Sequence, residues 1–478
     1  MKQRVSIIIV TWNKRADVLN LLDSLLAIRC TCANIVVVDN ASTDGSAEAV
    51  RLHPLAVTLL QNRENLGGTG GFNTGIRYAL QHLEQDYLWL LDNDAEVIAS
   101  TLDKIMMVME GDRSIGVAGS CIMSPEDHGL IVEAGGFVET ASATWRPHRR
   151  YQRYESLLMP GAVEDVDYVP TCSAVVRAEV FRRVGILDER FFLHWDDIDF
   201  CARARAAGFR VVSVLESQVF HGAEKGHSRM TLYYDFRNAL LYFSKHAAGV
   251  ARLRAVKALL ARNLVSCVYY LVTGRNAVAT YLYQGLADFR HGNFGMSTTS
   301  ACTLAVSSRA EEVSVKALDG MKKVLVFAVG SYDEVVGAVC ALKESNSDTV
   351  VHVAVAADRA EAYRLPEVER LVVFDLFRDG LLRKARSAAA IFAGGYDLGV
   401  SAGDAFTVPY AFVLRRNVVF DGGRGTFTTS DASIFSLWKI PFAMIGGNLL
   451  ALLFLVPILL SDKASSGVSM GSRSESAD

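Results

Sequence analysis

The sequence predicts an α/β protein with a large first domain, a helical extension, a second small doubly wound α/β domain and a C-terminal membrane segment. Three patterns predict this organisation. Short β-branched runs alternate with amphipathic stretches over the first 240 residues, and the same alternation returns over residues 321–430. Residues 440–460 hold no ionisable side chain, which is typical of a membrane helix.

Composition narrows the classes of function. The chain has 478 residues and a formal net charge of −3, so it lacks the positive charge that nucleic-acid binding requires. Hydrophobic residues make up 51% and the mean hydropathy is +0.22, which predicts that part of the chain meets lipid. The apolar run at 5–10 is too short for a signal peptide, and the eight cysteines form no CxxC pair, so we expect reduced cytosolic thiols.

Residues 1–240 are predicted to form the first domain. Strands are expected at 5–10, 35–38, 57–61 and 87–91, and helices around 18–27, 46–52 and 75–83. Continuous apolar runs of this kind are typical of parallel strands buried on both faces, whose ligands lie beyond the carboxyl ends of the strands. Polar residues that follow three of these strands predict one shared binding crevice: Thr11 and Asn13, Asp39 and Asn40, and Asp92 and Asp94.

The rest of the soluble part divides at a polar segment. Residues 241–296 are predicted to be the helical extension, and 297–320 a linker. Strands of the 321–430 domain are expected at 324–329, 349–355, 370–374, 397–400 and 417–420. This domain has neither GxGxxG nor a P-loop, so a scaffold or membrane-proximal docking role is favoured over a second active site.

The membrane segment is predicted over 434–461, followed by a disordered tail at 462–478. At about 1.5 Å per residue, the 21 residues 440–460 within it would just span a roughly 30 Å hydrocarbon core as a helix. A buried core helix is the alternative, and Gly446, Gly447 and Pro457 leave a kinked or re-entrant form open. Basic residues precede the segment and few follow it, which puts the preceding domains on the cytosolic side of the cytoplasmic membrane.

Asp92, Asn93 and Asp94 follow an apolar strand and place two carboxylates two residues apart. Such hard oxygen ligands hold Mn²⁺ or Mg²⁺ and, through the ion, a diphosphate. A surface turn is the alternative. Because the strand is apolar throughout, the two carboxylates would repel each other there unless a cation compensates their charge.

Two further segments are candidates for binding a ligand. Residues 65–73 hold four glycines and are predicted to form a loop before a helix, where the backbone approaches phosphates closely; a tight structural turn is the alternative. Asp39 ends the second strand, where its carboxylate can accept hydrogen bonds from a nucleobase or ribose. Asp44 is predicted to be the N-cap of the following helix.

The densest acidic cluster lies at 191–200, where Asp196, Asp197 and Asp199 are flanked by aromatic residues. Carboxylates crowded beside apolar rings have raised pKa values, which suits a general base. A capped helix start explains Asp199 but not all three carboxylates. His221 is a candidate third metal ligand, with a structural histidine as the alternative.

Together these motifs resemble those of the inverting family 2 glycosyltransferases with the GT-A fold, a nucleotide-sugar-binding domain. The resemblance covers residues 4–295, and its motifs fall in family order: Ser6–Asn13, Val38–Asp44, Asn65–Gly68, Leu91–Asp94, Gly185–Phe192, Trp195–Asp199 and His221. Gly67–Phe72, Trp195–Asp197 and Tyr233–Asn238 are most similar to the galactofuranosyl- and rhamnosyltransferase branch. No QxxRW sequence occurs, so the resemblance implies one or a few sugar additions per encounter.

The resemblance implies a role for each site residue. Asp197 is the implied catalytic base, and Asp196 beside it stands where the family often has Glu. Asp94 and His221 are the implied ligands of Mn²⁺ or Mg²⁺, with Asp92 near the ribose or the metal. The residues implied to bind the nucleotide diphosphate sugar donor are Thr11, Asn13, Asp39, Asn65, Gly67, Gly68, Asp92 and Asn93.

The expected function is a metal-dependent inverting transfer of galactofuranose or rhamnose from a nucleotide diphosphate to a hydroxyl of a lipid-linked glycan, in cell-envelope polysaccharide synthesis. A basic run is a candidate site for the phosphates of that acceptor, a solvated face being the alternative: Arg146, His148, Arg149, Arg150 and Arg153. The competing function is a non-catalytic nucleotide-sugar-binding scaffold on a degenerate GT-A fold. A sugar nucleotidyltransferase would need a Gly-rich loop after the first strand, where Thr11, Trp12 and Asn13 stand instead.

Overall fold

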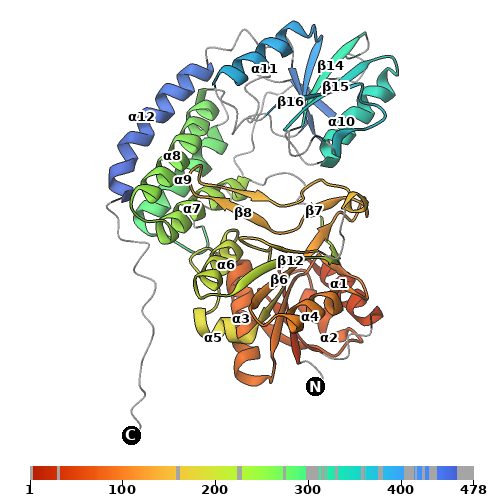
Figure 1. Cartoon of the computed structure of the whole chain (residues 1–478), viewed down its shortest axis with the longest axis vertical. Helices are drawn as coiled ribbons and strands as arrows, with labels where there is room; N and C mark the ends of the chain where they lie inside the picture. Colours follow the sequence, from red (N-terminus) through yellow and green to blue (C-terminus); the bar gives the residue numbers. More distant parts are fainter. Residues whose placement is uncertain are drawn as a thin grey trace.

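The structure of the protein, a computed structural model, contains two large β-sheets with a group of helices beside them (Figure 1). It describes residues 4–28, 33–157, 162–222, 229–272, 276–297, 312–313, 318, 320–328, 332–356, 360, 362–374, 381–402, 414, 417–421, 426–429 and 439–459. The predicted tail and almost all of the predicted linker lie outside these residues.

Within the described ranges, the first sheet has ten strands in the order β10-β12-β6-β11-β4-β1-β2-β3, with β5 paired to β12 and β7 paired to β6. The first four strands are parallel to their neighbours in this group, as predicted: β1 (Val5–Thr11), β2 (Ala33–Asp39), β3 (Thr58–Gln61) and β4 (Tyr87–Asp92). The other strands are β5 (Glu96–Val97), β6 (Ile115–Met123), β7 (Ile131–Glu133), β10 (Val163–Asp165), β11 (Ser173–Arg177) and β12 (Arg210–Phe220). Since β11 is antiparallel to both β4 and β6, the sheet is mixed.

Helices cover both faces of this sheet because successive residues of a strand point to opposite sides. On β1, Ile8 belongs to the same apolar cluster as Phe72 of α3, whereas Ile7 belongs to the cluster that contains Leu21 of α1. The helices of this unit are α1 (Arg15–Ala27), α2 (Ser46–Leu52), α3 (Gly67–His82), α4 (Thr101–Gly111), α5 (Ala178–Val184) and α6 (Asp196–Ala206). The two apolar layers are the core that fixes the ends of the strands.

The glycine-rich segment is helical, which corrects the prediction of a loop over 65–73: α3 already begins at Gly67. A Cβ added at Gly71 would lie 2.4 Å from a side-chain carbon of Val10, and one at Gly75 would lie 2.3 Å from a side-chain carbon of Ile8. These glycines therefore let the helix lie close to β1. Glycine weakens a helix by about 1 kcal/mol relative to Ala, and here the close packing outweighs that preference.

After the first sheet, three helices pack together: α7 (Arg229–His246), α8 (Gly249–Val272) and α9 (Asn276–His291). The second sheet has seven strands in the described part of the chain, in the order β13-β19-β18-β17-β14-β15-β16. Its strands are β13 (Glu312–Val313), β14 (Lys323–Phe327), β15 (Val350–Ala356), β16 (Arg370–Phe374), β17 (Leu398–Ala402), β18 (Asn417–Asp421) and β19 (Thr426–Thr429), and its helices are α10 (Tyr332–Ser345) and α11 (Leu381–Ala393). Five strands lie where the sequence predicts them, β13 and β19 were not predicted, and the domain boundaries stay predictions.

An insertion between β6 and β11 lies between the first sheet and the second sheet (Figure 1). It contains β7 and the two-stranded sheet of β8 (Gly136–Glu139) and β9 (Thr144–Pro147). From this insertion, the ring of Tyr151 packs against Tyr332 and Tyr363, at centroid distances of 6.2 and 6.5 Å. Tyr151 and Leu130 therefore belong to the apolar cluster of the second sheet.

The C-terminal helix α12 (Lys439–Leu459) packs against α8. A Cβ added at Gly447 would lie 2.4 Å from the backbone of Val265, so the two helices approach closely at this glycine. Among the described residues, two helices are long and apolar enough to cross a membrane, Gly249–Val272 and Phe442–Leu459. The ends of the predicted 434–461 segment, at 434–438 and 460–461, lie outside the described residues.

Candidate active site

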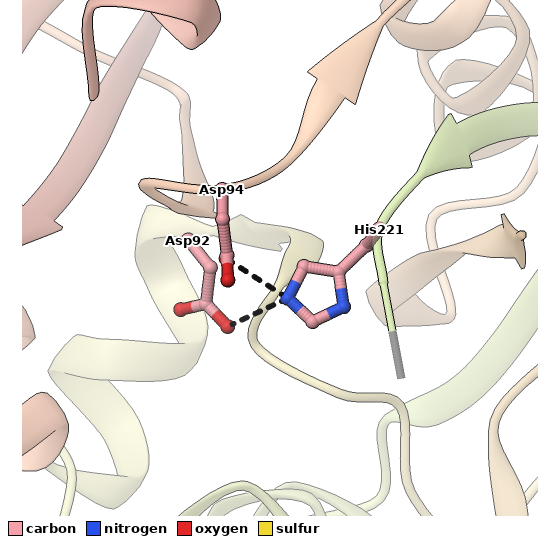
Figure 2. A group of neighbouring side chains, drawn as sticks. All are labelled: Asp92, Asp94 and His221. Carbon is pink, nitrogen blue, oxygen red and sulfur yellow. Dashed lines mark ion pairs between the residues drawn. The ribbon is translucent and has the colours of Figure 1, made fainter. Parts of the chain in front are cut away.

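The predicted metal ligands lie together at the carboxyl end of β4 (Figure 2). His221 Nε2 lies 3.0 Å from Asp94 Oδ1 and 3.8 Å from Asp92 Oδ2. Strand pairing explains the meeting of these distant residues, because β5, just after Asp94, pairs with the last two residues of β12, just before His221. The backbone N–H of His221 also donates to the carbonyl of Met123 at the end of β6.

The chemistry of these three side chains fits a hard divalent cation. One ligand atom from each of Asp92, Asp94 and His221 lies within 4.8 Å of the other two. Burial disfavours the charged form of Asp94, but the hydrogen bond and charge of His221 outweigh it and lower the pKa of that carboxyl. Two carboxylates and an imidazole are ligands that Mn²⁺ accepts readily, and Mg²⁺ shares the preference for carboxylate oxygen.

The other predicted donor residues lie at the same edge of the sheet. Thr11, the last residue of β1, is paired in register with Asp39, and its hydroxyl accepts a hydrogen bond of 3.2 Å from Asn93 Nδ2. Asp39 is buried, and its carboxylate accepts from the backbone N–H of Ser42 at 3.3 Å. Asn13 Oδ1 accepts from the backbone N–H of Thr43 at 2.7 Å.

Asp44 caps helix ends, although the residue at the N-cap position of α2 is Gly45, not Asp44 as predicted. Its carboxylate accepts from the backbone N–H groups of Ser46 and Arg15, both at 3.0 Å. Asp44 thereby satisfies one N–H at the start of each of α2 and α1, which is the physical role that the sequence predicts for it.

Asn65 and Gly67 link this edge of the sheet to the loop before α6, and Gly68 is the second residue of α3. Asn65 Oδ1 accepts from the N–H of Gly67 at 2.9 Å, and the carbonyl of Gly67 accepts from Asn40 Nδ2 at 2.8 Å. Gly67 has a φ of +71°, and a Cβ there would lie 2.2 Å from the carbonyl oxygen of Phe192. Only glycine fits this position, so part of the glycine signal is structural.

Asp196 and Asp197 open α6 and differ in what they contact. Asp196 is buried and accepts a 2.8 Å hydrogen bond from the hydroxyl of Thr69 on α3. Asp197 is partly exposed, and its carboxylate accepts a local hydrogen bond of 2.7 Å from the backbone N–H of Ile198. Burial, then the charge of Asp196, raise the pKa of Asp197 well above its usual range, as the sequence predicts for a base.

Asp199 has a different environment from its two neighbours. It is fully buried, and its carboxylate lies within 2.8 Å of side-chain nitrogens of Arg203, Lys245 and His246. Burial alone would raise its pKa, but the hydrogen bond of His246 and the charges of Arg203 and Lys245 outweigh burial and lower it. These contacts support the structural role that the sequence predicts.

Glu133, at the end of β7, is a buried carboxyl near the site that the sequence analysis did not single out. Its oxygens accept from Tyr168 Oη at 2.8 Å and from Arg150 at 3.1 Å. Burial raises its pKa, and its charge acts on both Asp197 and His221. The sequence does contain a feature that could have identified Glu133, since it is the one charged residue within the apolar run 130–134.

The basic run in the same insertion is largely paired. His148 and Arg149 contact Glu164, Arg150 contacts Glu133 and Arg153 contacts Asp127. Because three carboxylates already pair with these four side chains, the run offers less positive charge to acceptor phosphates than the sequence suggests. The guanidinium of Arg146 lies over the ring of Phe137, 5.3 Å from its centroid.

Comparison with known proteins finds a family match in the first part of the chain. Residues 6–185 match the family described as Glycosyl transferase family 2. A low-salt glycan biosynthesis hexosyltransferase of Haloferax volcanii, Agl10, is 26% identical over 250 residues, which cover 50% of this chain and 76% of the relative. The galactofuranosyltransferase GlfT1 of Mycolicibacterium smegmatis is 25% identical over 222 residues, covering 45% of this chain and 70% of the relative.

A third relative is the N-acetylglucosaminyl-diphospho-decaprenol L-rhamnosyltransferase of Mycobacterium tuberculosis, 23% identical over 247 residues, covering 48% of this chain and 78% of the relative. The resemblance seen in the sequence motifs, including that to galactofuranosyl- and rhamnosyltransferases, is thus confirmed. With its mixed sheet and acidic strand ends, the first unit has a GT-A-like α/β fold, and the chain carries a glycosyl transferase family 2 domain and is a glycosyltransferase.

Proposed function

We propose that the protein is a metal-dependent inverting glycosyltransferase that moves a sugar from a nucleotide diphosphate to a hydroxyl of a lipid-linked glycan. The observation that carries the proposal is the placement of two kinds of carboxylate near one edge of the sheet. Asp92 and Asp94 lie with His221 in a cation-binding arrangement. Asp197, on which the charge of Asp92 acts, has the raised pKa of a general base.

Asp92, Asp94 and His221 would hold Mn²⁺ or Mg²⁺, which stabilises negative charge on a departing diphosphate. Asp197 takes the proton from the acceptor hydroxyl as its oxygen attacks the anomeric carbon. The bond from that carbon to the diphosphate oxygen breaks on the opposite side, so the configuration inverts. Asp196 holds the start of α6 against α3 through its hydrogen bond with Thr69, and its charge helps to raise the pKa of Asp197.

The donor is proposed to lie along the carboxyl ends of β1, β2 and β4. Asp39 would accept hydrogen bonds from the base, while Thr11, Asn13 and Asn93 would border the ribose and diphosphate. Galactofuranose and rhamnose are the favoured sugars because two of the relatives are named for their transfer. The name of the rhamnosyltransferase also includes a diphospho-decaprenol acceptor, which supports a lipid-linked acceptor here.

A membrane location at the cytosolic face is part of the proposal. Helix α12 exposes a series of large apolar side chains: Phe442, Met444, Ile445, Leu449, Leu452, Leu453 and Val456. Leu453 is 71% exposed, so water would surround it if the helix did not meet lipid or protein. Such a surface suits an enzyme whose acceptor stays in the membrane.

A donor screen tests the function. Purified enzyme receives UDP- and dTDP-sugars with a short polyprenyl-diphosphate-linked glycan and MnCl₂, and the release of nucleoside diphosphate and the anomeric configuration of the product are measured. We expect one donor to give acceptor-dependent release and a product of inverted configuration. Donor binding without transfer from any donor would favour the scaffold alternative, and a retained configuration would exclude the direct displacement.

A pair of substitutions tests the membrane location. Replacing Leu452 and Leu453 by Arg places two charges on the exposed face of α12, where each costs about 2.5–3.5 kcal/mol in a bilayer. We expect this variant to leave the membrane fraction in a flotation assay. The matched control carries Arg at Leu52, an equally exposed apolar residue on α2. If the α12 variant floats with membranes like the control, α12 is not the anchor.

A further inference from the structure

The loop immediately before Asp196 and Asp197 has an unusual backbone. Three of its residues have positive φ angles: 65° at Phe192, 64° at His194 and 70° at Trp195. Residues that carry a Cβ rarely adopt this left-handed region, and such conformations persist only where the surroundings hold them. The question is therefore which side chains hold this loop.

Asn238 of α7 holds the loop through its side-chain amide. Its Nδ2 lies 3.0 Å from the carbonyl oxygen of Phe191, 2.7 Å from that of Leu193 and 2.9 Å from that of His194. The side chain is fully buried. The two N–H bonds of one side-chain amide thus serve three carbonyl groups within four consecutive loop residues, with one N–H shared between two of them.

Arg237, the preceding residue, extends the same contact. Its Nη2 donates to the carbonyls of Arg190 and Phe191 at 3.1 and 2.9 Å, and its Nε donates to Asn238 Oδ1 at 3.0 Å. The guanidinium is fully buried, and its centre lies 4.9 Å from the ring centroid of Tyr234. Burying a charged group is costly unless hydrogen bonds satisfy it, so these carbonyls and rings define its position.

The opposite side of the loop is held by the glycine-rich helix. The carbonyl of Phe192 accepts from the backbone N–H of Thr69 at 3.2 Å, and the Thr69 hydroxyl donates to Asp196. The ring of Phe192 stacks on Tyr234, with centroids 5.4 Å apart. The loop thus lies between α3 and α7, and it leads directly into Asp197.

We propose that Arg237 and Asn238 are positioning residues, which hold the loop 190–195 in its left-handed conformation and thereby place Asp197 for proton transfer. This assigns a role to the Tyr233–Asn238 motif, and it rests on the proposed function of Asp197 as the base. Neither side chain needs to touch substrate or metal, because both act through the backbone of the loop.

The test is an Asn238→Ala variant of the full chain, which removes all three loop contacts. A shift of about 1 Å at a catalytic group can lower a rate by roughly 10²-fold, so we expect kcat to fall by about 30-fold or more. Donor KM and the affinity for Mn²⁺, measured by electron paramagnetic resonance, should change less than about threefold. The control is Asn263→Ala on α8, whose amide donates to Leu259 of its own helix at 2.9 Å.

Two further measurements separate positioning from simple stability. Hydrogen exchange followed by mass spectrometry should show faster exchange in the peptide covering 190–197 for Asn238→Ala, with no such change for Asn263→Ala. Should Asn238→Ala not fold, Arg237→Lys replaces it, because Lys keeps the charge but cannot form the same fork of hydrogen bonds. A folded variant with wild-type kcat, or equal losses in kcat and Mn²⁺ affinity, overturns the proposal.

A double variant distinguishes this proposal from the proposed base itself. If Asn238 acts through Asp197, adding Asn238→Ala to Asp197→Asn should lower kcat less than about threefold further. Additive losses would mean that Asn238 acts elsewhere. If Asp197→Asn is fully active, the assignment of the base fails, whereas the exchange result at 190–197 still decides whether α7 holds the loop.

Discussion

Two aspartates at the same end of the first sheet, Asp94 and Asp197, have pKa values that are shifted in opposite directions. Beside His221, Asp94 has a lowered pKa although burial works against it. Asp197 has a raised pKa because burial is joined there by the charge of Asp196. Burial acts in the same direction at both sites, so the neighbour determines the outcome. The comparison suggests that one site is suited to a cation and the other to a proton.

Removal of the cation should have the largest effect. In Asp94→Ala the cluster loses a carboxylate within 3.0 Å of His221 Nε2. Because a departing diphosphate would lose its main charge stabilisation, we expect transfer to fall by roughly 10³-fold. Isothermal titration with MnCl₂ should show a matching loss of binding, and excess EDTA should reproduce the effect in the wild type. Undiminished transfer in EDTA would remove the metal from the mechanism.

Loss of the proposed base should have the second largest effect on the rate of transfer. Asp197→Asn keeps the shape of the side chain but cannot take a proton, so we expect kcat to fall by about 10²-fold, or about 2.7 kcal/mol, with donor affinity within a few-fold. A folded Asp197→Asn enzyme that works within tenfold of the wild type would move the base to Asp196.

The same substitution should raise stability. A carboxyl whose pKa is higher in the folded protein than in the unfolded chain destabilises the fold as pH rises between the two values. Without metal at pH 7, the Asp197→Asn protein should therefore unfold at a higher temperature than the wild type in scanning calorimetry. A lower Tm would contradict the raised pKa.

The pH dependence of the rate tests the contribution of the neighbouring charge. A proposed base such as Asp197 must be deprotonated to act, so kcat/KM should fall about tenfold per pH unit below its raised pKa. Asp196→Asn removes the negative charge that helps to raise this pKa. The acidic limb of the profile should thus shift to lower pH in this variant while activity is retained. An unchanged limb would mean that Asp196 does not act on the base.

Asp199→Asn should change the rate least. This side chain pairs with Arg203, Lys245 and His246, so its replacement leaves buried positive charge without a partner and should destabilise the fold by about 3 kcal/mol. Because its folded pKa is lowered, its stabilisation is present above the ordinary aspartate pKa and is lost as pH falls below it. Calorimetry should show less loss of Tm between pH 5 and 3 in the variant, whose kcat should stay within tenfold.

Much of the site could be predicted because it depends on local pattern. Apolar runs identify β1, β2 and β4, and their parallel pairing necessarily brings Thr11, Asp39 and Asp92 to one edge. The meeting of Asp94 with His221 depends on the pairing of β5 with β12, which no local pattern contains. That contact came from the family resemblance instead.

Other features depend on tertiary packing and were missed. Glycine disfavours helices, so 67–71 was expected in a loop, whereas contact with β1 and Phe192 explains glycine inside α3. Glu133 looks like an isolated polar residue until Arg150 and Tyr168 are placed beside it. Likewise, nothing in the sequence of α7 shows that Arg237 and Asn238 point inward.

The ring of Tyr151 packs against Tyr332 and Tyr363, so the insertion of the first unit is in contact with the apolar cluster of the second sheet. Arg150, the neighbour of Tyr151, donates to Glu133, whose charge acts on Asp197. The packing of three tyrosines thus connects the second sheet, through the segment that carries Arg150 and Glu133, to the carboxyl proposed as the base.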